Sequence, residues 1–335
     1  MKEFRTELIP SVSASPIGLR DKVFTIGSCF ADEIGNHLVE NKFKVWNNQF
    51  GTIYNPSSIH QSLLFALENT FPSPESYLQN DGLHLNYGLH SSYSSTNRQE
   101  LEDKIKDSIA EANEFLANSN RIIITYGTAF VYRLKSNNAI VANCHKIPSL
   151  NFTKSLLTEK EIVESFQELY SKLKLVNSKY KIVLTVSPVR HLKDTLELNS
   201  LSKSILRVVC HSIANQFSDV EYFPAYEILL DDLRDYRFYK TDRLHPTEEA
   251  VEYIWERFVT SYFDEPSKKF LNEWKEIEKD LRHRPFHPKS ENHQKFLNAV
   301  LGRLEIMNNT IDLSNEIQTL KSKISEIQNP SSRIQ

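Results

Sequence analysis

The stretch Val23-Phe-Thr-Ile-Gly-Ser28 decides the fold of this chain. Its first four residues form a short apolar run that ends at a glycine, which is typical of a buried strand. The segment after Ser28 places Ile34 and Leu38 four residues apart, as on one face of a helix. The stretch therefore predicts a buried strand that leads directly into a helix, with Gly27 and Ser28 at the turn.

The same order of elements recurs along the chain. Apolar runs that predict further strands lie at 43–46, 121–125, 181–186 and 220–223, and helical segments lie between them at 59–67, 101–116, 159–175 and 198–217. Strands that alternate with helices of this length predict βαβ units, in which helices cover both faces of a mostly parallel sheet. We therefore expect a three-layer α/β/α sandwich around a roughly five-stranded sheet.

Length and charge limit the domain organisation and the partners. Chains longer than about 250–300 residues tend to divide into domains, and this chain has 335. We expect an α/β domain over 1–265 and a C-terminal helical extension over 266–335. The formal net charge of -3 provides no global basic field for phosphates or anionic membranes, so neither nucleic acid nor a membrane is expected as a partner.

Two further features concern assembly and location. Ile317, Leu320, Ile324 and Ile327 form a short heptad-like stripe, which predicts either a homodimer through the C-terminal helix or a helix that folds back on its own domain. The N-terminal residues lack the apolar core of a signal peptide, and the number of cysteines, three, is odd. The sequence therefore predicts a reduced, cytoplasmic protein.

Glycines mark the edge at which the predicted strands end. The chain has only 8 glycines, and Gly27, Gly51 and Gly127 follow the first three strands. Glycine there permits tight turns and lets backbone N–H groups approach a substrate closely. Ser28 would project its hydroxyl from this edge, beside the free N–H donors of a helix N-terminus. The alternative is that Ser28 only caps the helix.

The segment Asp242-Arg-Leu-His-Pro246 is the second sign of chemistry. A neutral histidine can take a serine proton when an acceptor holds its other ring nitrogen. Asp242, three residues before His245, is placed to be that acceptor. The alternative is that both are ordinary residues at the start of a helix. Together with Ser28, the pair predicts a Ser-His-Asp triad.

The run Gly27-Ser-Cys-Phe-Ala31 resembles the motif that names the GSCFA domain family, which belongs to the SGNH/GDSL-like hydrolase superfamily. Further matching segments are Asn48–Pro56, Asn143–Lys146, Ser187–His191, Asp235–Tyr239 and Arg284–Pro288. The resemblance implies an SGNH-type fold and an ester hydrolase or acyl transferase that uses Ser28, His245 and Asp242. It implies no metal and no organic cofactor.

The oxyanion donors are a separate question. The N–H groups of Ser28 and Gly51 are the first two candidates, since acyl transfer needs donors aimed at the developing oxyanion. Many SGNH enzymes supply a third donor from an asparagine, but the corresponding stretch here is Gly127-Thr-Ala129. Thr128, Asn48 or Asn55 could substitute for it. Asn55 precedes Pro56, so it is equally a candidate turn residue.

Four residues are candidates for substrate contact, with a structural role as the alternative for each: Asn55, His145, Arg190 and His191. Cys29 adjoins Ser28, but its position inside the helix start favours a buried structural thiol. Cys144 and His145 lack a second pair at zinc-site spacing, so no metal site is predicted. The segment 71–97, rich in Ser, Asn, Tyr and His, predicts a long loop or a small subdomain.

The sequence thus predicts a serine esterase that acts on a small-molecule or glycan ester. A carbohydrate O-acetyl ester is the preferred substrate class, through the resemblance to SGNH enzymes. One alternative is an O-acyltransferase with the same triad, in which a sugar hydroxyl replaces water. The other is a non-catalytic binding module that uses the strand edge as a ligand platform.

Overall fold

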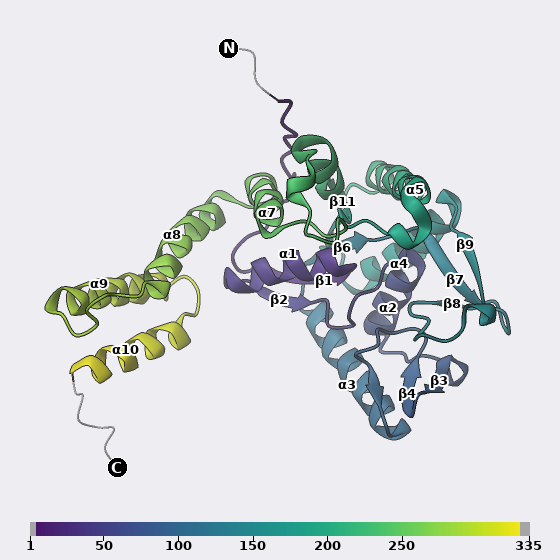
Figure 1. The fold of residues 1–335 in the computed structure, drawn as a ribbon, viewed down its shortest axis with the longest axis horizontal. Coiled ribbons are helices and arrows are strands. Elements are labelled where there is room, and N and C mark those ends of the chain that lie inside the picture. Colours follow the sequence, from purple (N-terminus) through teal and green to yellow (C-terminus); the bar gives the residue numbers. More distant parts are fainter. Residues whose placement is uncertain (1–4, 329–335) are drawn as a thin grey trace. The chain divides into compact units, whose positions relative to one another are not determined.

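The computed structural model describes residues 5–328 (Figure 1). The chain divides into two compact units, and the boundary lies between Phe263 and Asp264. Among the helices of residues 5–328, none combines the length and the apolar character needed to cross a membrane.

A five-stranded parallel sheet forms the centre of the first unit, in the order β11-β10-β6-β1-β2. The strands are β1 (Lys22–Gly27), β2 (Lys44–Asn47), β6 (Arg121–Tyr126), β10 (Lys181–Val186) and β11 (Val220–Phe223). Gly27 pairs with Thr125, and Thr125 pairs with Thr185. The ends of β1, β6 and β10 therefore lie level with one another at one edge.

Helices cover both faces of this sheet (Figure 1). They are α1 (Cys29–Glu40), α2 (Pro56–Glu68), α3 (Arg98–Ala117), α4 (Glu159–Val176), α5 (Thr195–Gln216), the short α6 (Ala225–Glu227) and α7 (Glu248–Tyr262). Helix α1 packs on β1, β2 and α7, whereas α2 packs with α3 and α4. The predicted three-layer α/β/α sandwich with a five-stranded parallel sheet is confirmed.

Helix α4 illustrates how the local sequence builds these layers. Thr158 and Glu161 form a capping box, which satisfies two backbone donors at the helix start. The buried residues that follow are spaced by four, three and four: Ile162, Phe166, Leu169 and Leu173. Each buried side chain of this kind contributes about 1.5–3 kcal/mol of transfer free energy. The apolar stripe therefore fixes which face of α4 meets the core.

Two small antiparallel sheets extend the first unit. One consists of β3 (Tyr77–Asn80), β4 (Leu83–Asn86) and β5 (Ser94–Ser95), so the segment 71–97 contains a small sheet. The other has the order β8-β7-β9, with β7 (Phe130–Leu134), β8 (Ile140–Val141) and β9 (Phe152–Leu156). This second sheet was not predicted, because its strands are short and lack a regular alternation.

The second unit contains α8 (Glu265–Arg282), α9 (Glu291–Met307) and α10 (Ser314–Gln328). Helix α10 packs on α9 and buries Leu320 and Ile324, two residues of the heptad-like stripe. Of the two alternatives, the structure therefore contains the helix that folds back on its own unit. The homodimer stays a prediction.

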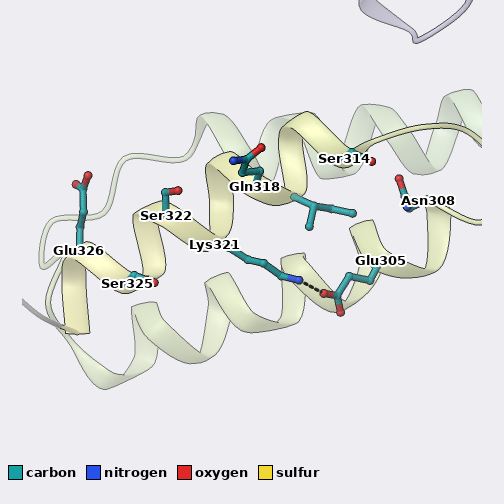
Figure 2. A pocket seen from close by; sticks show the side chains of 9 residues that line it. Glu305, Asn308, Ser314, Gln318, Lys321, Ser322, Ser325 and Glu326 are labelled. Atoms are coloured by element: carbon teal, nitrogen blue, oxygen red, sulfur yellow. Dashed lines mark ion pairs between the residues drawn. The ribbon is translucent and has the colours of Figure 1, made fainter.

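A shallow pocket, lined mainly by polar residues, lies along α10 and the end of α9 (Figure 2). Within it, Lys321 Nζ of α10 lies 2.7 Å from Glu305 Oε1 of α9. Both side chains are half exposed, and ion pairs of that kind contribute about 0–1 kcal/mol. The apolar contacts of Leu320 and Ile324 therefore contribute more than this ion pair to holding α10 against α9.

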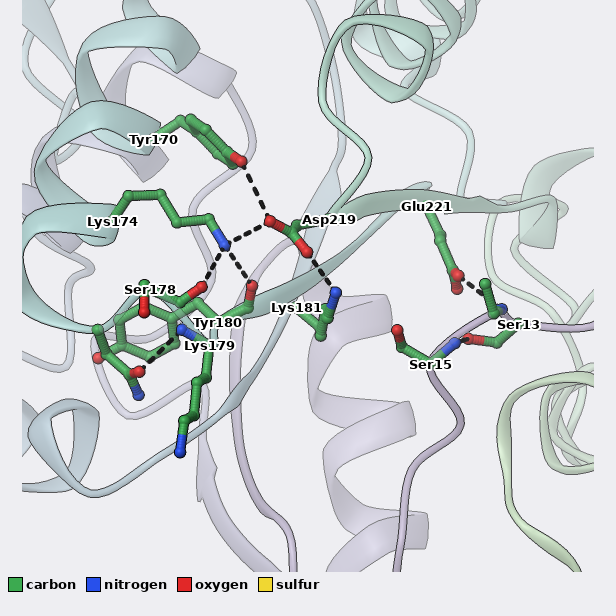
Figure 3. A network of polar contacts seen from close by, with 12 residues as sticks. Ser13, Ser15, Tyr170, Lys174, Ser178, Lys179, Tyr180, Lys181, Asp219 and Glu221 are labelled. Carbon is green, nitrogen blue, oxygen red and sulfur yellow. Dashed lines mark hydrogen bonds and ion pairs between the residues drawn. The ribbon is translucent and has the colours of Figure 1, made fainter.

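A network of charged side chains within the first unit connects α4 to the beginnings of β10 and β11 (Figure 3). Lys174 Nζ of α4 lies 2.7 Å from Asp219 Oδ2, and Lys181 Nζ binds Asp219 Oδ1. Nearby, the N–H of Ala14 donates to Glu221 Oε1 at 2.9 Å. The network lies at the edge opposite the ends of β1, β6 and β10, so its role is structural.

Asp219→Asn is expected to lower the free energy of unfolding by about 1–2 kcal/mol at pH 7. The hydrogen bonds from Lys174 and Lys181 lower the pKa of Asp219 to about 2, below its ordinary value of 3.8. Because the folded protein favours the carboxylate, this contribution is present above about pH 4 and is lost as the pH falls toward 2. Urea unfolding between pH 7 and pH 3 measures it.

The exposed Asp107 serves as the control, since Asp107→Asn should leave stability unchanged across this range. A loss in Asp219→Asn that stays the same at all pH values would contradict a contribution from the charge.

Candidate active site

Ser28 lies at the turn between β1 and α1, and the backbone there is tightly constrained. Gly27 has a φ of +139°, and a Cβ on it would lie 2.1 Å from the carbonyl oxygen of Thr125. The N–H of Ser28 donates to the same oxygen at 3.0 Å. Only glycine fits this approach of β1 to β6, so Gly27 fixes where Ser28 leaves the sheet.

The side chain of Ser28 does not cap the helix that follows. Ser28 occupies the N-cap position of α1, but its hydroxyl makes no capping hydrogen bond. Ser28 Oγ is buried and has no hydrogen-bond partner among the described residues. A buried unpaired hydroxyl costs about 1–3 kcal/mol, and such groups are concentrated at functional positions. The hydroxyl of Ser28 therefore does not cap α1.

Asp242 and His245 form the predicted pair. His245 Nδ1 lies 2.7 Å from Asp242 Oδ2, and Asp242 Oδ1 accepts from the N–H groups of Leu244 at 2.8 Å and His245 at 3.1 Å. The backbone bond from Leu244, then the contact with the His245 ring, lower the pKa of Asp242 to about 2. The carboxylate is thus ionised at neutral pH and orients the ring, which leaves Nε2 for another partner.

The loop that carries this pair is fastened to the end of β10 by Arg190. The N–H of Arg190 donates to the carbonyl of Leu244 at 3.2 Å, and its Nη1 donates to that of Arg243 at 3.4 Å. The guanidinium also lies 3.9 Å from the ring centre of Tyr239. Arg190, a candidate for substrate contact, thus holds the loop.

Ser28 and His245 lie at the same sheet edge but are not hydrogen bonded to each other, since Ser28 Oγ has no partner within residues 5–328. His245 and Asp242 are each 43% exposed, whereas Ser28 is fully buried. Catalytic hydrogen bonds in unliganded enzymes are often long and tighten only when substrate binds. The structure therefore contains an Asp242–His245 pair and, at the same edge, a buried Ser28 hydroxyl that no described residue hydrogen bonds.

His191 is the candidate for substrate contact that remains in the site. Its ring meets Tyr54 edge to face, with centroids 5.1 Å apart, and its buried Nε2 has no partner among the described residues. Burial, followed by the electrostatic effects of Lys203 and His245, lowers the pKa of His191 to about 3. His191 is therefore neutral at pH 7, and it lies close to His245.

Lys203 of α5 is part of this site and was missed by the sequence analysis. It is 1% exposed, and its Nζ donates to the carbonyls of Gly127 at 2.8 Å and Ser187 at 2.6 Å. Burial lowers its pKa to about 7. A helix lysine is usually solvated, but Lys203 lies three and seven residues before the buried Leu206 and Cys210. That spacing on the apolar stripe was the available signal.

The four predicted oxyanion donors are all engaged in the scaffold. Besides Ser28 N, already described, Gly51 N donates to Asn48 O at 2.8 Å and Asn48 Nδ2 donates to Asp32 Oδ1 at 3.0 Å. Thr128 Oγ1 lies 2.9 Å from Ser202 Oγ and accepts from Phe130 N at 3.1 Å. These groups shape the turns around Ser28, so the prediction that they are free to bind an oxyanion is not supported.

Two further candidates for substrate contact have structural partners. Asn55 is the N-cap of α2, and its Oδ1 accepts from Ser58 N at 2.9 Å. His145 Nε2 lies 2.7 Å from the carbonyl oxygen of Asn86, beside the small β3-β4-β5 sheet. In this structure, Asn55 and His145 therefore have the structural role that was the alternative to substrate contact.

Cys29 lies directly after Ser28, at the start of α1. Burial raises the pKa of Cys29 to about 11, so its thiol stays protonated at neutral pH and is a poor nucleophile. Within residues 5–328, no group of three or more His, Cys, Asp or Glu side chains is arranged to hold a metal ion.

Comparison with known proteins identifies the family. The model of the GSCFA family matches residues 22–258, which include the β1–α1 turn and the Asp242–His245 loop. The chain belongs to the GSCFA family. A second model, for the C-terminal domain of GSCFA domain proteins, matches residues 274–326. The GSCFA motif itself, Gly27–Ala31, is thus the turn that holds Ser28.

Several solved structures are similar to this GSCFA protein. A protein from Streptococcus pneumonia described as a candidate platelet activating factor is 11% identical, with a TM-score of 0.40, and the match covers 73% of this chain and 84% of that one. Family 3 carbohydrate esterases from Clostridium thermocellum and Talaromyces cellulolyticus are each 10% identical, with TM-scores of 0.32 and 0.30. Those matches cover 76% of this chain and 98% and 99% of the esterases. No curated protein matches it in sequence.

Proposed function

We propose that this GSCFA protein is a serine hydrolase that acts on ester bonds. The observation that carries the proposal is the 2.7 Å contact between His245 and Asp242, on a loop bound to the end of β10, at the edge where Ser28 has an unpaired hydroxyl. A serine, a histidine and a carboxylate with these roles form a proton-transfer chain for acyl transfer.

The reaction has two steps. Ser28 Oγ attacks the ester carbonyl while His245 Nε2 takes the serine proton and Asp242 stabilises the resulting imidazolium. The bond to the alcohol then breaks, and His245 returns the proton to the departing oxygen. Water attacks the acyl-enzyme in the same way and restores Ser28. Formation of a hydrogen bond between Ser28 Oγ and His245 Nε2, which the structure does not contain, precedes the first step.

The oxyanion is assigned to the first turn of α1. Helix N-termini leave their first N–H groups without intrahelical partners and carry a partial positive charge. The N–H groups of Cys29 and Phe30 follow Ser28 directly and point toward the start of the helix. Each donor to an oxyanion is worth about 3–4 kcal/mol of barrier. This assignment replaces the four donors that the scaffold uses.

A carbohydrate O-acyl ester is the proposed substrate class, in keeping with the SGNH-type resemblance. Tyr54 is 40% exposed and its ring meets that of His191, and an exposed aromatic residue in the site supports binding of a sugar face. An O-acyltransferase would use the same residues, with a sugar hydroxyl in place of water. Product that depends on an added acceptor, at the expense of hydrolysis, would distinguish it.

A non-catalytic binding module is the second candidate. It is favoured by the full burial of Ser28 and by the engagement of the four predicted oxyanion donors in structural bonds. In that case the edge would bind a ligand without an activated serine.

Labelling with a fluorophosphonate probe tests the proposal. The wild-type protein should be labelled at Ser28, and Ser28→Ala should remove the label completely. His245→Ala should slow labelling by about 10²–10⁴-fold, the usual contribution of a general base. Ser204→Ala removes an exposed hydroxyl and is the matched control, which should be labelled like the wild type. A folded wild-type protein that resists labelling would favour the binding module.

A further inference from the structure

Lys203 places a buried ammonium group between the ends of two strands. Its two acceptors, the carbonyls of Gly127 and Ser187, directly follow β6 and β10. Both acceptors are neutral, whereas buried lysines are normally paired with an acid. The cost of burying this side chain therefore calls for an explanation.

The groups that face Lys203 come from several other segments of the chain. They are the Cys29 thiol of α1, the His191 ring of the loop after β10, the ring of Tyr226 of α6 at 5.8 Å, and the carbonyls at the ends of β6 and β10. Burial raises the pKa of Cys29 and of Tyr226 and lowers that of His191, so all three are neutral at pH 7. None of them compensates the charge of Lys203.

Gly127 connects Lys203 to the nucleophile. Its N–H donates to the carbonyl of Tyr54 at 2.8 Å, and a Cβ on it would lie 3.2 Å from the Cβ of Ser28. The backbone of Gly127 is therefore held next to Ser28 by Tyr54, which accepts from its N–H, and by Lys203, which donates to its carbonyl. A shift of this peptide would change the position of Ser28.

Ser187 connects Lys203 to the rest of the site. The N–H of Ser187 donates to the carbonyl of Tyr126 at 2.9 Å, and its own carbonyl accepts from Lys203. Ser187 begins the segment that carries Arg190 and His191. One ammonium group thus holds both the peptide beside Ser28 and the start of the segment that holds the His245 loop.

We propose that Lys203 is a positioning residue of this site, which fixes the Gly127 peptide against Ser28 and the start of the Ser187–His191 segment by binding both carbonyls. The inference rests on the proposed function for its kinetic test. Its physical basis, a buried lysine without a compensating acid, can be tested without any activity.

The kinetic test uses Lys203→Met, which keeps the length of the side chain and removes the donors. Saturation kinetics with the fluorophosphonate probe should show a maximal labelling rate lowered on the order of 10²-fold, as for a misplacement of about 1 Å. The probe concentration at half-maximal rate should change little. Lys203→Arg keeps the donors and should recover part of the rate. Lys179→Met, at an exposed lysine, should behave like the wild type.

The second test measures thermal unfolding of the wild type and Lys203→Met between pH 7 and pH 10. The pKa of Lys203 is about 7 in the folded protein, below the ordinary 10.5, so the buried charge destabilises the fold fully below pH 7. This penalty disappears as the pH rises toward 10.5. The melting temperature of the wild type should therefore rise relative to that of Lys203→Met across this range.

The outcomes separate the two proposals. A wild-type protein that is not labelled would contradict the hydrolase, and the unfolding experiment would still decide the state of Lys203. Unchanged labelling of Lys203→Met would overturn its positioning role. So would a melting-temperature difference that stays constant from pH 7 to pH 10, because Lys203 would then not be a buried, uncompensated amine. If Lys203→Met fails to fold, the maximal rate of Lys203→Arg is compared with that of Lys179→Met instead, and equal rates of the two variants would overturn the role.

Discussion

Replacing Asp242 by asparagine is expected to lower the rate of ester hydrolysis by about 10⁴-fold while the loop stays folded. The structure separates the two roles of this carboxylate. Asp242 Oδ1 accepts from the backbone of Leu244 and His245, and an asparagine Oδ1 can accept the same bonds. Oδ2 faces His245 Nδ1 at 2.7 Å, where asparagine would present an NH₂ group. That donor favours the tautomer with the proton on Nε2, which cannot take the proton of Ser28.

Hydrolysis of p-nitrophenyl acetate and the rate of fluorophosphonate labelling measure this effect, with thermal unfolding as the check on the fold. Asp235→Asn is the matched control, since Asp235 Oδ1 accepts from Arg237 N at 2.8 Å in the same kind of turn. It should retain activity. If Asp242→Asn kept wild-type rates, Asp242 would be only a turn residue. Because the pKa of Asp242 is about 2, its protonation should not reduce activity until the pH approaches that value.

Gly27→Ala should destabilise the first unit by about 4 kcal/mol or more, which is exceptional for a single methyl group. The φ of +139° is strained for any residue with a Cβ, and strain of this kind costs about 1–3 kcal/mol. The added Cβ would in addition lie 2.1 Å from the backbone oxygen of Thr125, and neither strand can move without losing its pairing. The turn would therefore have to open.

Alanine substitutions at two glycines with no neighbouring atoms around the added Cβ serve as controls. They distinguish the cost of backbone strain from the cost of a steric clash. Gly82→Ala has a φ of +72° and no atom within 4 Å of the new Cβ, so it should cost only about 1 kcal/mol. Gly302→Ala lies inside α9, also in open space, and should stabilise that helix by about 1 kcal/mol. Urea unfolding of the three variants provides the comparison. If Gly27→Ala cost no more than Gly82→Ala, the close approach to Thr125 would not govern this turn.

The fold was largely predictable because its signals are local and repeated. The five apolar runs became the five strands of one parallel sheet, and the helices between them follow their apolar stripes. The sheet β8-β7-β9 was not predictable in the same way. Its members β7 and β9 are joined only by antiparallel pairing between residues about 20 positions apart, and β8 has two residues. Such strands are defined by their partner and carry little pattern of their own.

In the candidate site, too, local contacts were predictable from the sequence and contacts between distant segments were not. Asp242 and His245 are three residues apart in one turn, so their contact is a local property that a motif can indicate. Whether Gly51, Thr128 or Asn48 has a free donor depends on which acceptors neighbouring segments bring close, and each proved to be engaged. A hydrogen bond between distant segments leaves no trace in the local sequence.

The sequence by itself determined the five-stranded parallel sheet, the position of Ser28 at the end of β1 and the Asp242–His245 pair. These follow from apolar periodicity, from one glycine and from a three-residue spacing, all of which act over short stretches of chain. Only the tertiary structure decided that Ser28 is buried and unpaired and that Lys203 binds the carbonyls behind it. Burial and long-range hydrogen bonding depend on which segments meet, and Lys203 is 76 residues from Gly127 in the chain.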